Sequence, residues 1–542
     1  MIISQQFSTQ GSTVTPGIQR RMFLTGVAAF GATPALLSLL TACSSTNGAS
    51  TSSVMKIGSS ANFEDFDPLH VPQGNFAFFN QIYGSLVRDT GQAVENDVTP
   101  WLATKIAQDS GGEFVDIDLR SGVVYHDGAE FNSDAVVANL KKVIDPIDGR
   151  DLYPLWGPLI KDWKVLGDHK IRLNFTGPLP EPLLAVLLGD WYLSSPKLIA
   201  KGQKAFLTEA SGTGAYQLAN YKSGVSTTLK RFPKYWRKTT GTFTELEYEV
   251  FQSPAAMVNA LHAGTVDMAY YVPVQDVNTL KSDFTIITSP PAFTYEVILN
   301  AKADRPFANI ETRQAMQYLV PRQKFVDNAL FGLGVPTCVH PTKGSVGWSE
   351  SLSNAFQYDP ERAKETFKKF NMLGKDPIEI VQLTGILPGI AALAEITAAE
   401  MNAIGLNAKL IPVDVAGWAD RFFGAHAGDY DVMCSFMGRA NRYPTQWAGT
   451  NAALKPVDNP SWGGGPTPKD YSTAYNELLH AVGPDAQEEW ATKLIQAGLT
   501  QSWDIAVANF GLQYALKKEL TGVVDSRDDF IILEDARSNK QP

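Results

Sequence analysis

The chain has 542 residues, of which 44% are apolar and 19% are charged, so its composition is that of an ordinary globular protein and not of a disordered one. Its formal net charge of −10 argues against general nucleic-acid binding, because a phosphate backbone requires a basic protein face. This charge does not exclude a small anionic ligand, since a local pair of arginines can act inside an acidic protein. Three cysteines, with no Cys-x-x-Cys pair, argue against a disulfide framework and against a cysteine-based zinc site.

The first 42 residues have the layout of an export signal. Arg20 and Arg21 precede a moderately apolar stretch at 27–40, which is too short and too rich in glycine for a permanent membrane span. The adjacent arginines, followed shortly by Phe23 and Leu24, resemble a twin-arginine signal. The sequence therefore predicts a signal peptide over 1–42.

A lipid-attachment motif follows this signal. The run Leu-Thr-Ala-Cys that ends at Cys43 resembles a bacterial lipobox, which implies cleavage before Cys43 and a diacylglycerol on its thiol. The alternative is an ordinary buried cysteine in a start-transfer helix. Residues 43–53 are rich in Ser, Thr, Gly, Asn and Ala, a composition typical of a flexible tether. We expect an extracytoplasmic protein anchored to the cell membrane through Cys43, and the sequence leaves open whether Cys338 and Cys434 form a disulfide.

The first part of the body alternates strands with helices. Residues 54–58 form a short predicted strand, and 113–119 alternate between polar and apolar residues like a half-buried strand. Asn132 is the expected cap of a helix whose apolar face holds Val136, Val137, Leu140 and Ile144. Residues 245–250, a helix opened by Ser253 and Pro254, and a strand at 265–271 predict one βαβ unit.

A second series of elements follows Asn300. Asp359 and Pro360 open a helix with Ala363, Phe367 and Phe370 on one face. The predicted elements after it are a strand at 378–383, a helix at 388–404 closed by Gly405, a strand at 407–413, a helix at 418–423 and a strand at 430–436. Strands that alternate with helices indicate a largely parallel sheet with covered faces.

Five short blocks, in this order along 54–525, carry a resemblance to a known family. They lie at 119–128 with 131–136, at 212–216 with 234–236, at 300, 305–307 and 312–315, at 358–363, and at 404–407. Together they resemble the dipeptide, oligopeptide and nickel-binding proteins of bacterial ABC importers, extracellular solute-binding protein family 5. The resemblance implies an α/β, two-lobed fold like that of class II periplasmic binding proteins, with an extra subdomain inserted in the first lobe.

The resemblance also implies where the lobes begin and end. The first lobe is expected at 54–85, 195–295 and 506–542, with the inserted subdomain at 86–194 and the second lobe at 296–505. The ligand is enclosed when the lobes close about a hinge.

The loop after the predicted 430–436 strand is the main candidate for ligand recognition. In peptide-binding relatives the matching loop resembles Gly-Trp-x-x-Asp-Tyr, and its Asp pairs with the ammonium group of the peptide. Here Arg439 stands at the Trp position and Arg442 at the Asp position. An arginine there repels an ammonium and offers a two-point contact to a carboxylate or phosphate. Alternatively, both arginines are solvated or pair with Asp429 or Asp431.

Other residues are candidates because of where they stand relative to predicted strands. Ligands of an open α/β sheet meet the loops beyond the carboxyl ends of its strands. For Trp418 and Trp447, packing inside the protein is the alternative role. These candidates are Tyr443, Trp447, Trp418, Asn62 and Phe63. The run at 212–214, Gly-Thr-Gly, is instead expected to be a tight structural passage of the backbone.

The chain shows no pattern typical of catalysis. It contains no Gly-x-Ser-x-Gly, no His-Glu-x-x-His and no phosphate-binding loop, and its seven histidines are scattered singly. We expect a binding protein without cofactor or metal, a monomer that passes a peptide-like or anionic solute to a membrane permease. The alternatives are an extracellular hydrolase, or a ligand sensor or chaperone on the same fold.

Overall fold

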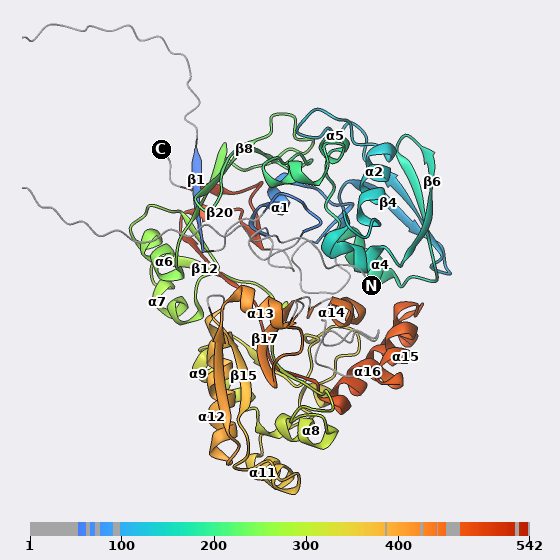
Figure 1. Cartoon of the computed structure of the whole chain (residues 1–542). Coiled ribbons are helices and arrows are strands. Elements are labelled where there is room, and N and C mark those ends of the chain that lie inside the picture. The colour runs from blue at the N-terminus through green and yellow to red at the C-terminus, as the bar shows by residue number, and fades with distance from the viewer. Residues whose placement is uncertain are drawn as a thin grey trace, which may run out of the picture. The chain divides into compact units, whose positions relative to one another are not determined.

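Three sheets of seven, six and four strands organise the part of the chain that the structure describes (Figure 1). The structure is a computed structural model and describes residues 53–60, 65–70, 76–89, 98–384, 387–422, 426–438, 440–441, 443–450, 467–525 and 531–539. All three sheets belong to one compact unit that begins at Ser52.

The seven-stranded sheet of the first lobe is built from both ends of the body. Across the sheet its strands are β12 (Phe284–Thr288), β19 (Gln513–Lys517), β11 (Met268–Tyr270), β1 (Val54–Ser59), β10 (Glu245–Val250), β9 (Ser226–Arg231) and β8 (Tyr216–Lys222). The predicted one-sided strand is confirmed, because Leu246 and Tyr248 are buried while the glutamates between them are partly exposed. Helix α6 (Pro254–His262) begins as expected, with the Ser253 side chain accepting from Ala256 N. β1 lies between β10 and β11 and runs parallel to both, so the strands of the predicted βαβ unit are not neighbours.

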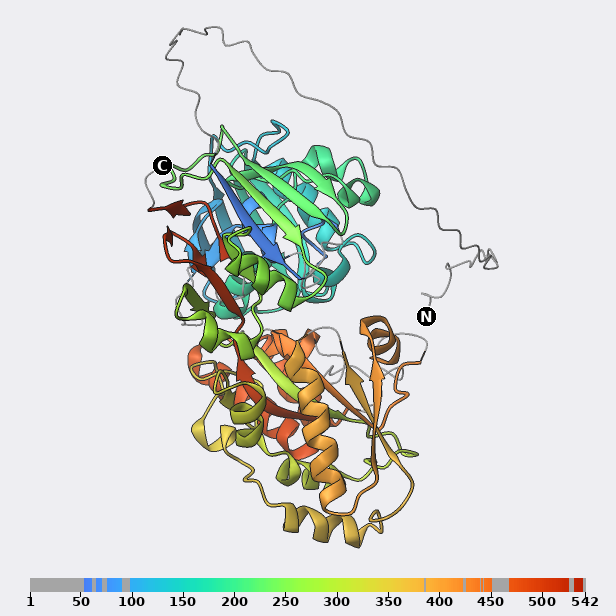
Figure 2. The ribbon, with the colours of Figure 1, turned by 90° about the vertical axis from the view of Figure 1, so that its left-hand side faces the viewer.

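The six-stranded sheet forms the second lobe. Its order is β14 (Val335–Pro336), β18 (Asp504–Phe510), β13 (Phe293–Leu299), β17 (Val432–Gly438), β15 (Ile378–Leu383) and β16 (Ala408–Val413). The long helix α12 (Pro388–Ala403) lies along the face of β15, β16 and β17, as Figure 2 shows. Gly405 ends this helix region with a φ of 97°, a left-handed conformation that suits glycine.

Most of the predicted helices are confirmed with shifted ends. The Asn132 side chain caps α2 (Ser133–Val143) and that of Asp359 caps α11 (Pro360–Lys369), each by accepting from a backbone N–H. The remaining helices of the first lobe and its insertion are α1 (Phe76–Ile82), α3 (Tyr153–Trp156), α4 (Glu181–Asp190), α5 (Pro196–Ile199) and α7 (Val277–Leu280). Those of the second lobe are α8 (Ile310–Leu319), α9 (Arg322–Ala329), α10 (Glu350–Ser353), α13 (Val415–Phe422), α14 (Pro444–Thr450), α15 (Lys469–Leu479) and α16 (Pro484–Gln501).

The expectation of a largely parallel sheet is wrong. Parallel pairing is confined to β11–β1–β10 in the first sheet and to β17–β15–β16 in the second. The other neighbours in both sheets are antiparallel. The β8–β9 hairpin extends the first sheet beyond β10, β13 runs antiparallel to β17, and the late strands β18 and β19 enter the sheets from near the end of the chain. Alternation of strands and helices along the sequence does not reveal such additions.

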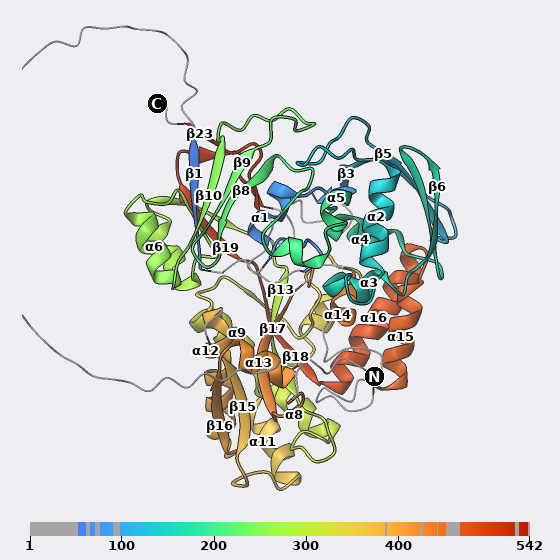
Figure 3. The same cartoon turned by 45° about the horizontal axis from the view of Figure 1, so that its top comes forward.

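A separate antiparallel sheet lies in the inserted region (Figure 3). Its strands are β4 (Ala103–Gln108), β5 (Phe114–Leu119), β7 (Lys170–Phe175) and β6 (Ile160–Gly167). Val115, Ile117 and Leu119 are buried and the residues between them are partly exposed, as their alternation predicts. The two-residue period therefore identified this strand correctly.

The run at 212–214 is the tight passage that was expected. A Cβ on Gly212 would lie 2.1 Å from the carbonyl oxygen of Ile82, and one on Gly214 would lie 2.3 Å from that of Gln81. Neither position can therefore hold a side chain without a shift of the backbone. His126 closes the passage with a 3.0 Å hydrogen bond between Nε2 and the Gly214 oxygen, and burial lowers the pKa of this imidazole to about 4.

The structure bears on three further expectations. The proposed lobe limits at 295/296 and 505/506 fall within β13 and β18, and these limits remain a prediction. Cys338 and Cys434 are both buried free thiols, and burial raises the pKa of Cys434 to about 12. Among the described residues no helix is both long enough and apolar enough to cross a membrane.

Candidate ligand site

Two neighbouring segments connect the sheets of the two lobes. The chain leaves the first sheet after β12 and enters the second at β13, and it returns from β18 to β19. The two connections bond to each other, because Ser289 N donates to Leu512 O at 2.9 Å and Ala292 N donates to Phe510 O at 3.1 Å. Leu512 N also donates to Ser289 Oγ at 2.7 Å. This pair of connections is the position at which a hinge between the lobes is expected.

Gly511 allows the two connections to lie close together. A Cβ at this position would lie 2.0 Å from the carbonyl oxygen of Ser289. On the second-lobe side, the ring of Tyr295 stacks on that of Phe510 with centroids 4.0 Å apart and 17° between the ring planes. The connection is therefore well packed at its second-lobe end and has no side chain at its closest point.

The parallel strands of the first lobe end together at one edge of the sheet. Ser59, the last residue of β1, lies opposite Val250 of β10 and Tyr270 of β11. The next residue, Tyr271, has a φ of 66°, which costs a residue other than glycine about 1–3 kcal/mol. Its ring lies 4.2 Å from that of Tyr270 and 5.8 Å from that of Tyr514. Backbone strain of this kind clusters at ligand sites, and the sequence placed Tyr271 in a strand without singling it out.

The loop after β17 begins at the connection between the lobes. Ala440 N donates to Ala292 O at 2.9 Å, and Ala440 O accepts from Thr342 N at 3.0 Å. Arg439 directly precedes Ala440 in this loop. Arg439 and Arg442 lie outside the described residues, so their contact with a ligand remains a prediction.

Asp429 and Asp431, the alternative partners considered for Arg439 and Arg442, both lie close to Arg305. Arg305 lies 3.3 Å from Asp429 and 3.4 Å from Asp431, measured between guanidinium nitrogen and carboxylate oxygen. The Arg305 block singled out by the sequence is therefore a structural one. Asn300 of the same block is also structural, because its side chain donates to the carbonyls of Gly428 and Tyr430.

Of the remaining candidates, the structure describes the side chains of Tyr443 and Trp418. Tyr443 is fully buried, and its hydroxyl donates to Leu478 O at 3.2 Å. Trp418 of α13 is half-buried and stacks on Phe422 with centroids 5.0 Å apart. Asn62, Phe63 and the side chain of Trp447 lie outside the described residues. Of the loop after β17, the structure thus places Ala440 at the connection between the lobes, and ligand contact by the chosen side chains remains a prediction.

Comparison with known proteins identifies the family. The sequence profile of the bacterial extracellular solute-binding proteins, family 5 (middle region), matches residues 97–461. The chain belongs to this family. The expected resemblance and the two-lobed α/β fold are confirmed.

Curated relatives of this family 5 protein are binding proteins by name. The glutathione-binding protein GsiB of Salmonella typhi is 26% identical over 256 residues, which are 47% of this chain and 49% of that protein. The chain thus matches about half the length of these relatives. Di/tripeptide-binding protein 1 of Pseudomonas aeruginosa is 23% identical over 391 residues, 67% of this chain and 71% of that protein.

Solved structures share the fold of this family 5 protein. AgaA of A. tumefaciens, in complex with agropinic acid, superimposes with a TM-score of 0.76 at 20% identity, covering 90% of this chain and 99% of AgaA. DppA of Helicobacter pylori, in complex with a peptide, has a TM-score of 0.78 at 17% identity, covering 90% of this chain and 98% of DppA. At these identities the likeness establishes the fold alone.

Proposed function

We propose that this protein is the extracytoplasmic solute-binding component of an ABC importer, which encloses a small ligand between its lobes and delivers it to a membrane permease. The observation that carries the proposal is the pair of bonded connections at Ser289 and Gly511, in a chain of a solute-binding family. Two adjacent connections permit the lobes to close about a ligand without breaking either core. The protein acts as a monomer, binds its solute without a cofactor and does not bind nucleic acid.

The ligand is proposed to be peptide-like or to carry an anionic group. Relatives are named for glutathione and for di- and tripeptides, and AgaA was solved with an organic acid. All these ligands offer a carboxylate that an arginine can recognise. The identity of the ligand is tested by mass spectrometry of the small molecule that denaturation releases from the purified protein.

The alternative functions predict different behaviour. An extracellular hydrolase would turn over members of a peptide or glycan pool, whereas a solute-binding protein retains one member stoichiometrically. A sensor or chaperone on this fold would bind ligand without supporting its uptake by cells that carry the permease.

Ligand binding should make the protein more compact. Small-angle X-ray scattering at saturating ligand should give a smaller radius of gyration than the ligand-free protein, because the lobes close. The melting temperature should rise as well, since a ligand at about 100 times its Kd stabilises the folded state by about 2.7 kcal/mol. A solute that does not bind, at the same concentration, is the control. An unchanged scattering profile at proven saturation would contradict closure.

Arg442→Ala should weaken binding of an acid-bearing ligand by roughly ten- to a hundredfold. A charge-assisted contact between arginine and carboxylate contributes about 1.5–3 kcal/mol, which corresponds to this change in Kd. Arg442→Lys should recover only part of the affinity, because an ammonium cannot make the planar two-point contact. Calorimetry with the released ligand measures all three proteins.

Arg439→Ala is the second variant of this series and should weaken binding less than Arg442→Ala. If Arg442→Ala binds as tightly as the wild type, Arg442 does not touch the ligand. The proposal that this loop selects an anionic group then fails.

A further inference from the structure

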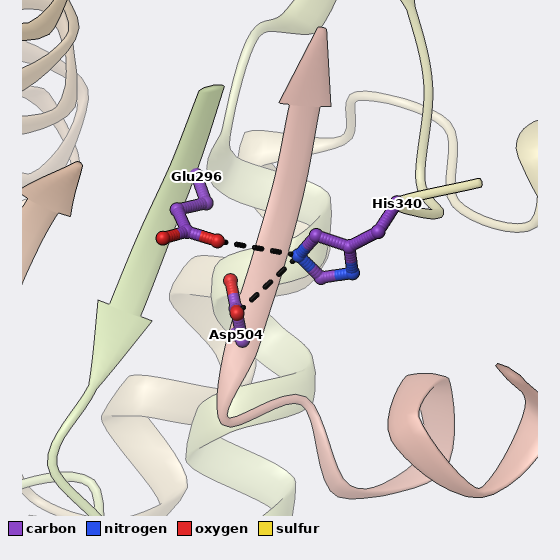
Figure 4. A group of neighbouring side chains, drawn as sticks. All are labelled: Glu296, His340 and Asp504. Carbon is purple, nitrogen blue, oxygen red and sulfur yellow. Dashed lines mark ion pairs between the residues drawn. The ribbon is translucent and has the colours of Figure 1, made fainter. Parts of the chain in front are cut away.

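A histidine and two carboxylates meet in the interior of the second lobe (Figure 4). Glu296 lies on β13, Asp504 begins β18, and His340 lies in the segment after β14. Their side chains are 3%, 0% and 9% exposed. The ligand atoms of these three side chains all lie within 4.8 Å of one another.

A β-bulge places the two carboxylates on the same face of the sheet. Val507 is the extra residue of this bulge, so Glu296 lies opposite Ala506 and Asp504 lies opposite Ile298. Residues that oppose each other in antiparallel strands share a face, and so do residues two apart on one strand. An unbroken register would shift Asp504 by one position and turn its side chain to the other face. Bulges that re-aim a side chain in this way are common next to functional sites.

The backbone of His340 is held against the same two strands. Its carbonyl oxygen accepts from Thr294 Oγ1 at 3.1 Å and from Asn509 Nδ2 at 2.9 Å. Thr294 belongs to β13 and Asn509 to β18. The three side chains are therefore positioned by the core of the lobe.

The two distances from His340 to the carboxylates match the spacing of ligands around a small metal ion. His340 Nε2 lies 3.4 Å from Glu296 Oε2 and 3.3 Å from Asp504 Oδ2. A charged N–H···O contact is usually shorter, about 2.7–2.9 Å. Zinc–ligand bonds of about 2.0–2.1 Å in a tetrahedron place the ligand atoms about 3.4 Å apart. When the imidazole is neutral and both carboxylates are ionised, the three side chains carry two negative charges, which a divalent cation would neutralise.

A small pocket next to the cluster provides room for a fourth ligand. It has a volume of about 20 Å³ and is lined by His340, Asp504, Cys338 and Tyr471, among others. This volume accommodates about one water molecule. Tyr471 is fully buried, and its hydroxyl has no hydrogen-bond partner in the described part of the protein. A water at this point could bind both a metal ion and the Tyr471 hydroxyl.

We propose that Glu296, His340 and Asp504 bind one divalent transition-metal ion of the zinc type, with a water molecule from the adjacent pocket as the fourth ligand. The ion joins β13, β18 and the 337–342 segment. The role of this ion is to stabilise the second lobe.

Metal analysis of the whole protein tests this proposal. The protein is stripped with a chelator, loaded with Zn²⁺ and dialysed against metal-free buffer. Elemental mass spectrometry should then find about one zinc per chain, and the melting temperature should rise with added Zn²⁺, because the ion binds the folded state. Co²⁺ loaded into the wild type should give the visible absorption bands of a four-coordinate ion, a result that depends on no variant.

His340→Gln and Asp504→Asn should each weaken Zn²⁺ binding by at least about 100-fold, because loss of a ligand has a larger effect than loss of a group that only orients one. The matched control is His70→Gln. His70 lies 2.8 Å from Asp65 in another partly buried ion pair, and this change should leave zinc binding unchanged. A folded wild type that retains no zinc and gives no four-coordinate cobalt spectrum overturns the proposal. Zinc binding that survives both ligand variants overturns it as well.

Discussion

Cys43→Ala should move the protein from the membrane fraction to the soluble extracytoplasmic fraction. If Cys43 carries a diacylglycerol, two acyl chains hold the protein to the bilayer, and each buried CH₂ contributes about 0.8 kcal/mol. Two such chains are enough for stable anchoring, whereas the described body offers no helix suited to crossing a membrane. Fractionation after a high-salt wash, followed by immunoblotting, measures the change.

A second variant, in the arginine pair of the signal, tests the route of export. Arg20→Lys together with Arg21→Lys should leave the precursor in the cytoplasm, because the twin-arginine route reads the arginine pair. A Cys43→Ala protein that still sediments with membranes after the wash would show that the anchor lies elsewhere. Export of the double lysine variant would point to the general secretory route.

Lys142→Met should lower the free energy of unfolding by about 3–5 kcal/mol, because it leaves a buried carboxylate without its cation. Lys142 Nζ donates to both oxygens of Asp67 at 2.8 Å, and the two side chains are 6% and 0% exposed. Burial lowers the pKa of Lys142, although the carboxylate of Asp67 opposes this shift. The ion pair joins α2 of the inserted region to the loop after β1. Urea unfolding at neutral pH measures the loss.

Two further proteins make this test specific. Lys141→Met removes a neighbouring exposed lysine from the same helix and should change stability by less than about 0.5 kcal/mol. The double variant Lys142→Met with Asp67→Asn should lose less than the sum of its single changes, because it leaves no isolated charge in the interior. Equal losses for Lys142→Met and Lys141→Met would contradict a contribution of the buried pair.

Local patterns in the sequence were sufficient for the elements that depend on near neighbours. The alternation at 113–119 identified β5, and the caps at Asn132, Ser253 and Asp359 located three helix starts. A strand face or a helix cap is decided by residues within about one helical turn, so it is visible in a short window. The ordered blocks along 54–525 also identified the family, which the profile match over 97–461 confirms.

Sheet order and direction depended on contacts that no short window contains. β19 enters the first sheet between β12 and β11, although it stands near the end of the chain. A strand carries the same alternation whether its neighbour is parallel or antiparallel, so the predicted parallel sheet was wrong. Likewise, Tyr271 reads as an ordinary strand residue, and only its φ of 66° sets it apart.

The sequence by itself thus determined the family, the two-lobed α/β class and the ends of many elements, and it predicts the anchor at Cys43 and the arginines of the β17 loop. Only the tertiary structure decided which distant side chains meet. Lys142 and Asp67, and likewise Glu296, His340 and Asp504, stand far apart in the chain and form no motif. The last three meet because of a single extra residue, Val507, in β18. A one-residue change of register reverses the faces of a strand, and such a change is set by the packing of the whole sheet and not by the residues beside it.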